Sequence, residues 1–394
     1  MWKDEHNKKR KTVTYKMKIT FDRDELDAAV TPLTGVVSKN NTIAAIEGIQ
    51  INAEDNFCVL SGFDMEKGMR VTLNADVEQA GCFVINAVKL SQIIKTMPSG
   101  KITIEVMARN ITKIYSGKSE FQLQALDGDD FPNLPEFDGE QGFNIKRCEL
   151  AQMIKKSDFA VAVNDPRAEL NGLHVEIEGK RIKMVSSDRN RIAVVERICE
   201  LENHGEEELN SSFTIPTKTL PELTRMLGTS ENNVSIKLGR KHIIFTCDNI
   251  VFFTRILDKE FIDYNRFIPT SFAINLKING ERLLQSLERA LLITENIQKG
   301  ETKASLRCNF NEDKLILSTA SSTGRFYDEI GVEKEGEDIE IGFNCRYLIE
   351  VIRSCDPGEL SVSLNSPLMS MVIEPVIVDE NNKYLYMILP VRLK

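Results

Sequence analysis

The chain repeats one pattern of strands and helices three times, and this repeat constrains its fold more than any other feature. Each copy contains a strand with alternating apolar residues that leads into a helix with leucine or isoleucine periodicity. These strand–helix pairs are expected at 17–21 with 24–37, at 142–145 with 148–161, and at 272–276 with 281–293. Recurrence in this order predicts three related domains.

A second strand–helix pair also occurs once in each copy. It is expected at 83–86 with 88–97, at 213–216 with 220–227, and at 341–344 with 347–354. Ile85, Ile215 and Phe343 take equivalent places in these strands, 130 and 128 residues apart. Alternating segments at 102–106, 234–238 and 360–364 predict further antiparallel strands. We therefore expect an α+β fold of three repeated domains, each with two helices on antiparallel sheets.

Each copy ends in a similar closing segment, and these segments define the expected domain boundaries. Two of them begin at Asp130 and Glu260, and the third begins at Tyr384 and runs to the end of the given sequence. Order, spacing and closing segment agree, which disfavours a chance recurrence. We expect a flexible basic extension at 1–16 with a net charge of +4, followed by domains at 17–137, 142–269 and 271–394.

Composition places the chain among globular proteins, with 42% hydrophobic and 28% charged residues. No stretch approaches the about 18 consecutive apolar residues of a membrane span, and no apolar run follows the basic start as in a signal peptide. The eight cysteines lie ten or more residues apart, which gives neither a metal-binding CxxC pair nor a dense disulfide framework. We expect reduced thiols and a cytoplasmic location.

The sequence carries little that suggests catalysis. It contains four histidines and none of the common hydrolase, metalloprotease, P-loop or dinucleotide-binding motifs. The acidic run Asp127-Gly128-Asp129-Asp130 could hold a metal ion, but a solvated turn is the more common role of such a run. We therefore expect no enzyme activity, no metal and no cofactor, with an unrecognised active site as the alternative.

Charge is distributed unevenly between the expected helices and the rest of the chain. The whole chain carries −9, which argues against a generally basic nucleic-acid binder. The windows 24–38, 89–97, 146–157, 217–227, 281–293 and 346–354, which include the residues that lead into the expected helices, nevertheless carry +4 together. Helix propensity offers another explanation, because Lys and Arg are good helix formers. The pattern suggests a basic helical surface without establishing it.

Five short segments carry a resemblance to a known family. They are Asp130-Phe131-Pro132-Asn133-Leu134, Leu170-Asn171-Gly172-Leu173, residues 188–193, Ile341-Gly342-Phe343-Asn344 and the tail Leu389-Pro390-Val391-Arg392-Leu393. In this order, across residues 17–393, the chain resembles the sliding clamps, the beta subunit of bacterial DNA polymerase III. Two departures at a candidate binding rim, Arg189 and Asn190, fit a divergent or second-copy member.

The resemblance implies a clamp that confers processivity by encircling duplex DNA without sequence preference. Family members are head-to-tail homodimers, so two chains of three domains would form a ring of six, with helices lining the hole and sheets outside. A diffuse attraction between basic side chains and phosphates would suffice in such a ring. The DNA-facing candidates are Lys39, Lys95, Lys155, Arg167, Arg225, Arg282, Arg289, Arg346 and Arg353.

The resemblance also implies two protein contacts. At the dimer interface, Phe121 and Leu123 of one chain would meet Leu292 and Ile293 of the other. A pocket between the second and third domains would bind short linear motifs of DNA polymerases, the clamp loader and repair factors. Its candidate residues are Leu170, Ser187, Arg191, Ile192, Arg266, Phe267, Tyr347, Leu368, Ser370, Met387, Leu389, Pro390, Val391 and Arg392. The alternative is a clamp-fold interaction scaffold that no longer loads onto DNA.

Overall fold

The structure is a computed structural model that describes residues 15–38, 42–135, 141–294, 305–322, 324–356, 358–376, 379 and 381–393. Its described residues form two compact units. The first unit draws on residues 1–139 and 235–255, and the second on residues 140–234 and 256–394. The expected basic extension at 1–16 lies almost wholly outside the described residues, as does Lys39.

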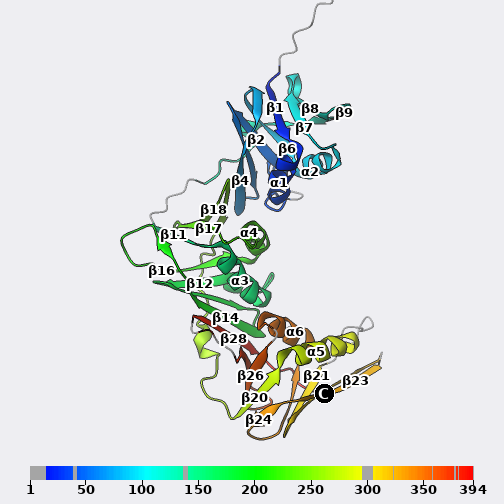
Figure 1. Cartoon of the computed structure of the whole chain (residues 1–394), viewed down its shortest axis with the longest axis vertical. Helices are drawn as coiled ribbons and strands as arrows, with labels where there is room; N and C mark the ends of the chain where they lie inside the picture. The colour runs from blue at the N-terminus through cyan, green and yellow to red at the C-terminus, as the bar shows by residue number, and fades with distance from the viewer. Residues whose placement is uncertain are drawn as a thin grey trace, which may run out of the picture. The chain divides into compact units, whose positions relative to one another are not determined.

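The first unit contains two antiparallel sheets and the helices α1 (Arg23–Leu33) and α2 (Ala87–Thr96), which pack against each other (Figure 1). One sheet has the order β5 (Asp76–Gln79), β1 (Met17–Asp22), β7 (Lys101–Val106), β8 (Ile111–Ser116) and β9 (Ser119–Gln124). The other runs through β10 (Leu126–Asp127), β6 (Gly81–Asn86), β2 (Gly48–Glu54), β3 (Phe57–Phe63), β4 (Lys67–Asn74), β19 (Ile250–Arg255), β18 (His242–Cys247) and β17 (Asn233–Leu238). Strands from the first and second repeats thus share a sheet through the pairing of β4 with β19.

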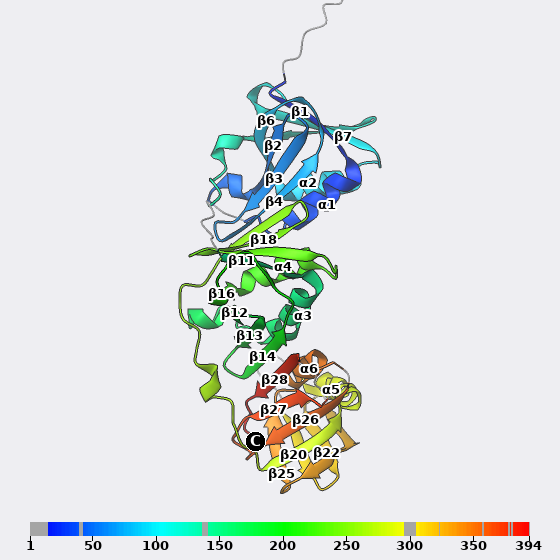
Figure 2. The same cartoon turned by 60° about the vertical axis from the view of Figure 1, so that its left-hand side comes forward.

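The second unit is built around a nine-stranded sheet (Figure 2). Its order is β16 (Asn210–Pro216), β12 (Gly172–Glu178), β13 (Arg181–Ser187), β14 (Arg191–Ile198), β28 (Asn382–Ile388), β27 (Met371–Pro375), β26 (Glu359–Leu364), β20 (Ile274–Asn279) and β24 (Glu333–Glu335). A four-stranded sheet of β23 (Gly324–Gly331), β22 (Lys314–Ser321), β21 (Leu306–Asn311) and β25 (Ile339–Phe343) accompanies it. The short strands β11 (Gln141–Lys146) and β15 (Glu202–Asn203) pair with each other.

Two helix pairs belong to the second unit. Helix α3 (Arg147–Ser157) packs on α4 (Leu220–Leu227), and α5 (Gly280–Thr294) packs on α6 (Cys345–Ser354). Helix α3 contacts β13 and β14 while α6 contacts β28, so both repeats place a helix on the shared sheet (Figure 1). The expected architecture, two helices on antiparallel sheets per repeat, is confirmed.

Local chemistry explains where the helices begin. The Asp22 side chain accepts hydrogen bonds from the N–H groups of Asp24 and Glu25 at the start of α1. Asn86 and Asn344 cap α2 and α6 in the same way. Such caps satisfy backbone donors that have no partner within the helix. Polar caps therefore start these three helices.

Two helices end earlier than the sequence periodicity suggested. Helix α1 ends at Leu33 rather than at Val37, one residue after Pro32, which has no N–H to continue the hydrogen-bond ladder. Helix α3 ends at Ser157, and residues 158–160 continue as a short 3₁₀ turn instead of helix to Val161. Apolar spacing continues past each end because the following turn also packs on the core.

An arginine at the start of the first helix stabilises the end of the second helix in two repeats. Arg23 donates to the carbonyls of Ile94 and Lys95 at the end of α2, at 3.2 and 3.1 Å. Arg147 donates to the carbonyls of Met226 and Leu227 at the end of α4, at 2.8 and 3.0 Å. A cation at a helix C-terminus also interacts favourably with the helix dipole. Each bond fixes one helix of a pair against the other.

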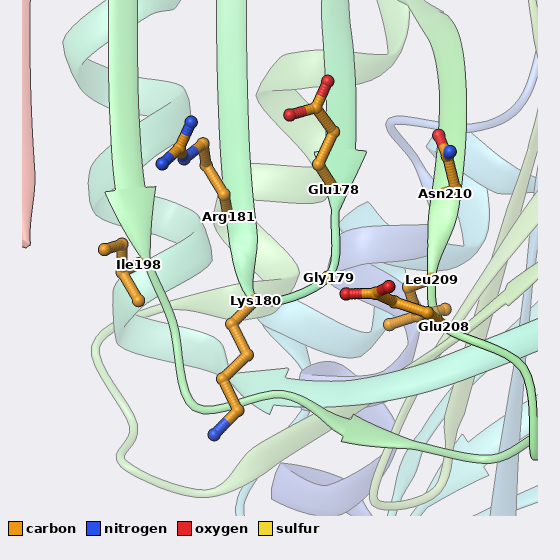
Figure 3. A pocket seen from close by; sticks show the side chains of 8 residues that line it. All are labelled: Glu178, Gly179, Lys180, Arg181, Ile198, Glu208, Leu209 and Asn210. Carbon is orange, nitrogen blue, oxygen red and sulfur yellow. The ribbon is translucent and has the colours of Figure 1, made fainter.

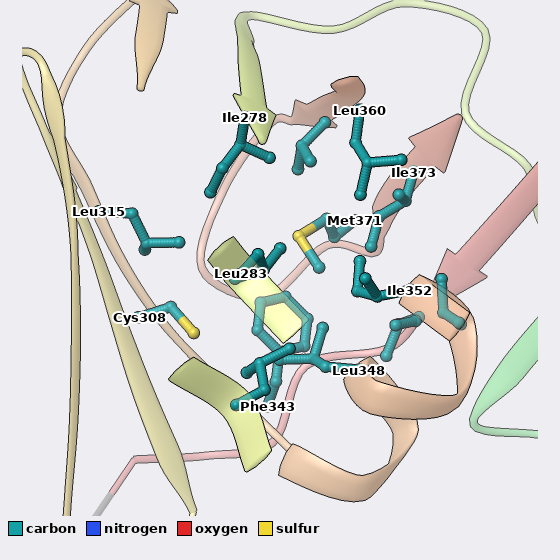
Figure 4. Close-up of a cluster of buried hydrophobic side chains, with 14 of the residues drawn as sticks. Ile278, Leu283, Cys308, Leu315, Phe343, Leu348, Ile352, Leu360, Met371 and Ile373 are labelled. Atoms are coloured by element: carbon teal, nitrogen blue, oxygen red, sulfur yellow. The ribbon is translucent and has the colours of Figure 1, made fainter. Parts of the chain in front are cut away.

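The third repeat has a single large apolar core between its two sheets and helices (Figure 4). Phe343, Leu348, Ile352 and Met371 all lie in it and are almost fully buried. A void of about 20 Å³ beside Cys308 and Met371 is lined by apolar side chains alone. Its apolar lining offers a water molecule no hydrogen-bond partner, so we expect it to be dry.

The closing segment of the second repeat is fastened to the sheet by polar contacts. The Phe261 ring stacks on His174 with centroids 4.7 Å apart, and the Tyr264 hydroxyl donates to Glu176 at 3.1 Å. The hydrogen bond from His174 lowers the pKa of Glu176, whereas burial raises the pKa of Tyr264. Tyr264 is buried with Ile192 and Met387 in one apolar cluster. The segment thus anchors the connection to the third repeat.

All eight cysteines are free thiols, and burial raises the pKa of Cys58 and of Cys199 to about 12. Thiols with such a pKa are poor nucleophiles at neutral pH. Within the described ranges, no group of three or more His, Cys, Asp or Glu is arranged to hold a metal ion. Among the same residues, no helix is both long enough and apolar enough to cross a membrane.

Candidate DNA-facing helices and partner-binding junction

Eight of the nine DNA-facing candidates lie in the described residues, and all eight are exposed. Seven are on helices: Lys95 on α2, Lys155 on α3, Arg225 on α4, Arg282 and Arg289 on α5, and Arg346 and Arg353 on α6. Arg167 lies in the turn before the 3₁₀ segment 168–170. The helix cations therefore point away from the cores that their helices cover.

Part of this positive charge is neutralised within the chain. Arg353 pairs with Glu288 of α5 at 2.7 Å, and Arg289 pairs with Asp328 of β23. Arg225 lies 3.7 Å from Glu222. Lys95, Arg167 and Arg282 form no such ion pair with any described residue. Exposed pairs are weak, so phosphates can compete for these arginines.

The turn that carries Arg167 is held by a network of local hydrogen bonds. The Asp165 carboxylate accepts the Arg167 backbone N–H at 2.9 Å. The Asn171 side chain accepts the Asp165 N–H and donates to the Asp165 carbonyl, both at 2.8 Å. Asn164 has a φ of +56°, in the left-handed region that asparagine tolerates better than most residues. Arg167 thus projects from a defined turn.

Asp158, just past the end of α3, has a carboxyl group whose charged form is disfavoured by burial. Burial raises the pKa of its carboxyl to about 6, although the backbone N–H groups of Asp158 and Phe159 and the charge of Lys155 oppose this rise. A carboxylate at a helix C-terminus is also disfavoured by the helix dipole. The folded state therefore holds a proton that the unfolded chain releases near pH 4.

We expect the Asp158→Asn variant to be more stable than the wild type at pH 8. A raised carboxyl pKa makes stability fall as pH rises from about 4 to 6, because the native state binds more protons in that window. The gain should be about 1–2 kcal/mol above pH 6, after a discount for partial exposure, and should vanish below pH 4. Urea denaturation at a series of pH values checks this, and a gain that is constant with pH would contradict the assignment.

The second and third repeats join through a continuous strand pairing. Strand β14 pairs antiparallel with β28 from Arg191 opposite Ile388 to Arg197 opposite Asn382. Tyr386, Met387 and Ile388 are buried in this junction. A second contact comes from Lys156, which donates to Asp356 at 2.5 Å and lies 4.7 Å from the Tyr384 ring centroid. The two repeats therefore hold a fixed arrangement at this junction.

Arg191 is the central side chain of the junction, and each of its three side-chain nitrogens has a partner within the chain. Its Nε donates to Asp188 at 2.9 Å, its Nη2 donates to the Phe159 carbonyl at 2.6 Å, and its Nη1 pairs with Glu350. The guanidinium also lies over the rings of Phe159 and Tyr347, 5.1 and 4.3 Å from their centroids. Its side chain is only 7% exposed. Arg191 therefore fastens β14 to α6, and its expected place in the peptide pocket stays a prediction.

The other expected pocket residues divide into a buried and an exposed group. Buried beneath the surface are Leu170, Ser187, Ile192, Ser370 and Met387. Exposed or half-buried are Arg266, Phe267, Tyr347, Leu368, Leu389, Pro390, Val391 and Arg392. Leu368 is 80% exposed and Phe267 is 57% exposed, which is unusual for large apolar side chains. We call this second group, with the rim turn 188–191, the junction surface.

Backbone hydrogen bonds attach the tail residues of the junction surface to the rim turn and to Gly342. The Leu389 N–H donates to the Asn190 carbonyl and the Val391 N–H donates to the Gly342 carbonyl, both at 2.8 Å. A side chain at Gly342 would meet the Val391 carbonyl at 2.6 Å, so glycine permits this close approach. Leu389 and Val391 remain 40% and 36% exposed.

A shallow cavity of about 500 Å³ lies elsewhere, at the far end of the β12–β13 hairpin (Figure 3). Charged side chains line it, among them Glu178, Arg181 and Glu208, with the half-exposed Ile198 at its edge. None of the expected pocket residues lines this cavity or the small void in the third repeat. The junction surface is thus a set of exposed apolar side chains rather than one of these two cavities.

The expected interface residues lie on two separate edges. Phe121 and Leu123 are on β9, which ends its sheet, and Phe121 is 41% exposed. Leu292 and Ile293 are at the end of α5, and Leu292 is 66% exposed. An exposed phenylalanine on an unpaired edge strand invites pairing with another chain.

Sequence reasoning missed the partners that hold Arg191. Glu350 is 159 positions away in the chain, and Phe159 contributes a carbonyl and a ring that no sequence pattern marks. It also missed Asp165, whose carboxylate lies 3.5 Å from Arg189. The only signal was the turn sequence around Asp188, where an aspartate at the start of a tight turn favours bonds to the following N–H groups.

Three repeats of a helix pair on antiparallel sheets, joined by strand pairing and carrying exposed cations on their helices, define a clamp-type protein. The chain belongs to the family of the DNA polymerase III beta subunit. The N-terminal, central and C-terminal domain models of this family match residues 17–135, 144–263 and 265–392.

Individual relatives agree with this assignment. The beta sliding clamp of Bacillus subtilis is 27% identical over 95% of this chain and all of its own length, and that of Vibrio cholerae is 26% identical over 96% and 100%. The crystal structure of the Bacillus subtilis sliding clamp superposes with a TM-score of 0.88 at 26% identity, covering 97% of this chain and all of that one. A sliding clamp from Pseudomonas aeruginosa bound to griselimycin gives a TM-score of 0.85 at 25% identity, over 96% and 100%.

Proposed function

We propose that this chain is a sliding clamp that encircles duplex DNA and tethers polymerases, without catalysing a reaction itself. The observation that carries the proposal is the full-length match to three successive clamp domains, whose helices bear exposed cations. A closed ring retains DNA by topology, so diffuse phosphate contacts are sufficient. A clamp-fold scaffold that no longer loads onto DNA is the second candidate.

The strand pairings within the chain support a head-to-tail homodimer. Strand β4 of the first repeat pairs with β19 of the second, and β14 of the second pairs with β28 of the third. By repeat equivalence, the third such pairing would join β23 of the third repeat to β9 of a first repeat. Both strands end their sheets in the single chain. A partner molecule can supply the missing pairing, and two such contacts close a ring.

The repeats also predict the register of that pairing. The strand pairings give Phe121, Phe252 and Tyr386 equivalent positions in the three repeats. Ile104, Ile236 and Val362 are equivalent residues of β7, β17 and β26. Following the pairing from each of them across two strands leads to Phe121, Phe252 and Tyr386. In the same way, the pairings of β3 with β4, of β13 with β14 and of β22 with β23 give Met69, Ala193 and Phe326 equivalent positions. Met69 lies opposite Phe252 and Ala193 opposite Tyr386. We therefore propose that Phe326 of one chain lies opposite Phe121 of the other.

Burial agrees with this register. The four residues of the two internal pairs, Met69, Phe252, Ala193 and Tyr386, are fully buried. Phe326 is only partly buried and Phe121 is 41% exposed. Pairing would complete the burial of both rings, and an aromatic pair contributes about 0.5–1.5 kcal/mol beyond its buried area. Leu123, Leu292 and Ile293 would belong to the same interface.

Retention on circular DNA tests the clamp proposal. A clamp loaded on nicked circular DNA is expected to remain bound through gel filtration and to escape once the circle is cut, because only the closed circle confines the ring. Charge reversal at Arg282 and Lys95, which lack ion-pair partners among the described residues, should speed loss from circles and weaken its dependence on salt. The Lys180→Glu variant, on the hairpin of the shallow cavity, serves as control. Equal escape from circles and linear DNA would favour the scaffold.

The junction surface is the proposed docking site for partner peptides of polymerases, the clamp loader and repair factors. Exposed Leu368, Leu389, Val391 and Phe267 would supply apolar contacts, and the buried group beneath them supports their positions. Because Arg191 is committed to Asp188 and Glu350, its role there is to position Tyr347 and the rim turn.

A further inference from the structure

We propose that Arg189 makes the junction surface selective for peptides that carry a carboxylate beside their apolar anchors. The inference rests on the proposed docking site and adds a specificity-determining residue to it. It follows from the rim turn, from the charges around it and from its attachment to the chain's tail.

The rim turn has a close counterpart in the first repeat, which shows what is particular to it. Asp188 accepts the N–H groups of Asn190 and Arg191 at 3.0 and 3.2 Å, and Asp64 accepts those of Glu66 and Lys67 at 3.0 and 2.8 Å. The second residue of each turn is left-handed, with φ of +75° at Arg189 and +78° at Met65. Both side chains are exposed, at 54% for Arg189 and 52% for Met65.

A left-handed backbone costs a residue with a Cβ about 1 kcal/mol relative to glycine. The turn therefore gains no stability from an arginine at this position. Its side chain is half-exposed, and its only ion-pair partner among the described residues is Asp165, at 3.5 Å. The same Asp165 carboxylate already accepts the Arg167 N–H at 2.9 Å.

The charges at the rim differ in how firmly they are held. Asp188 and Glu350 are both bound by Arg191, so neither repels an incoming anion with a full free charge. Arg266 pairs with Asp263 at 2.7 Å. Arg189, with its loose and half-exposed pair, and Arg392, which has no ion pair with a described residue, remain available. Arg189 and Arg392 are thus the two rim cations without a short ion pair to a described residue.

Arg189 is also next to the apolar part of the surface. The carbonyl of the adjacent Asn190 accepts the N–H of Leu389, whose side chain is 40% exposed. A peptide that contacts Leu389 therefore passes within reach of the guanidinium. Exchange of Asp165 for a peptide carboxylate breaks a long pair of 3.5 Å, and Asp165, whose side chain is 15% exposed, keeps the Arg167 N–H that it already accepts. A bidentate arginine–carboxylate contact would replace it.

The test compares two labelled peptides that differ in one group. Both carry leucine and phenylalanine anchors, and the intervening residue is aspartate in one and asparagine in the other. We expect the full-length wild-type protein to bind the aspartate peptide about three- to tenfold more tightly in fluorescence anisotropy. Arg189→Met should abolish that ratio and leave the asparagine peptide unaffected, while Arg189→Lys should keep part of it. Met65 shows that methionine fits this backbone conformation.

The control is Arg181→Met, an exposed arginine at the opposite end of β13 that pairs loosely with Glu196 at 3.7 Å. It should leave the ratio unchanged. A ratio that survives Arg189→Met overturns the role of Arg189 and leaves the docking site intact. Failure of the wild type to bind either peptide overturns the docking site as well. A loss confined to retention on circular DNA would assign Arg189 to DNA instead and overturn the proposal.

Discussion

Replacing Phe121 with aspartate is expected to convert the proposed dimer into monomers. The variant removes an aromatic ring that the repeat equivalence places opposite Phe326 and puts a charge where the equivalent Phe252 and Tyr386 are fully buried. The lost burial alone amounts to about 2 kcal/mol. A ring of two chains contains this interface twice, so the dimer should weaken by at least about 1,000-fold. Sedimentation velocity over a concentration series measures the effect.

The control for this experiment is another exposed phenylalanine in the same unit. Phe57 is 37% exposed and begins β3, away from the edge strand β9. Phe57→Asp should leave the dimer unchanged. Leu292→Asp offers an independent test from the other side of the interface, because Leu292 is 66% exposed at the end of α5. A Phe121→Asp protein that remains dimeric at micromolar concentration would refute the proposed interface.

Replacing Arg191 with alanine is expected to lower the free energy of unfolding by about 3 kcal/mol. Its removal leaves Asp188 and Glu350 without their shared cation in a junction where Arg191 is 7% exposed. Breaking a buried pair from one side costs more than the pair itself contributes, because the remaining charges stay partly desolvated. Urea denaturation measures the loss, and binding of the asparagine peptide should fall with it because Tyr347 loses its support.

Arg353→Met is the matched control, since Arg353 also pairs with a glutamate of the third repeat but is 60% exposed. An exposed pair contributes at most about 1 kcal/mol, so this variant should be nearly as stable as the wild type. Equal losses for the two variants would show that burial does not distinguish the two pairs. Glu350→Gln should recover part of the Arg191→Ala loss, because it removes one of the stranded charges.

The repeat and the element order were predictable from local patterns. Apolar alternation marks β1, β7 and their equivalents, and the caps at Asn86 and Asn344 mark the starts of α2 and α6. Apolar periodicity predicted the end of α1 wrongly, because the apolar spacing continues past Pro32 although the helix ends at Leu33. The exact domain boundaries, including that at 269–271, remain predictions.

The candidate site was predictable only in part. Resemblance placed cations on helices and apolar residues at the junction, and both groups occupy those elements. It could not show that Arg289 and Arg353 have acidic neighbours, because Asp328 and Glu288 belong to different elements from the arginines they bind. It also could not show that Arg191 bonds to Asp188, Glu350 and Phe159 within the chain.

The amino-acid sequence by itself determined the elements, their threefold order and the sign of charge on the helices, because these depend on residues a few positions apart. Only the tertiary structure decided which of those charges have acidic partners and which apolar residues at the junction are buried or exposed. It also decided that Arg191 is buried with three partners, whereas Arg189 is half-exposed. Those properties depend on burial and on partners up to 159 positions away in the chain. Desolvation and pairing act between side chains in space, and local sequence does not specify those neighbours.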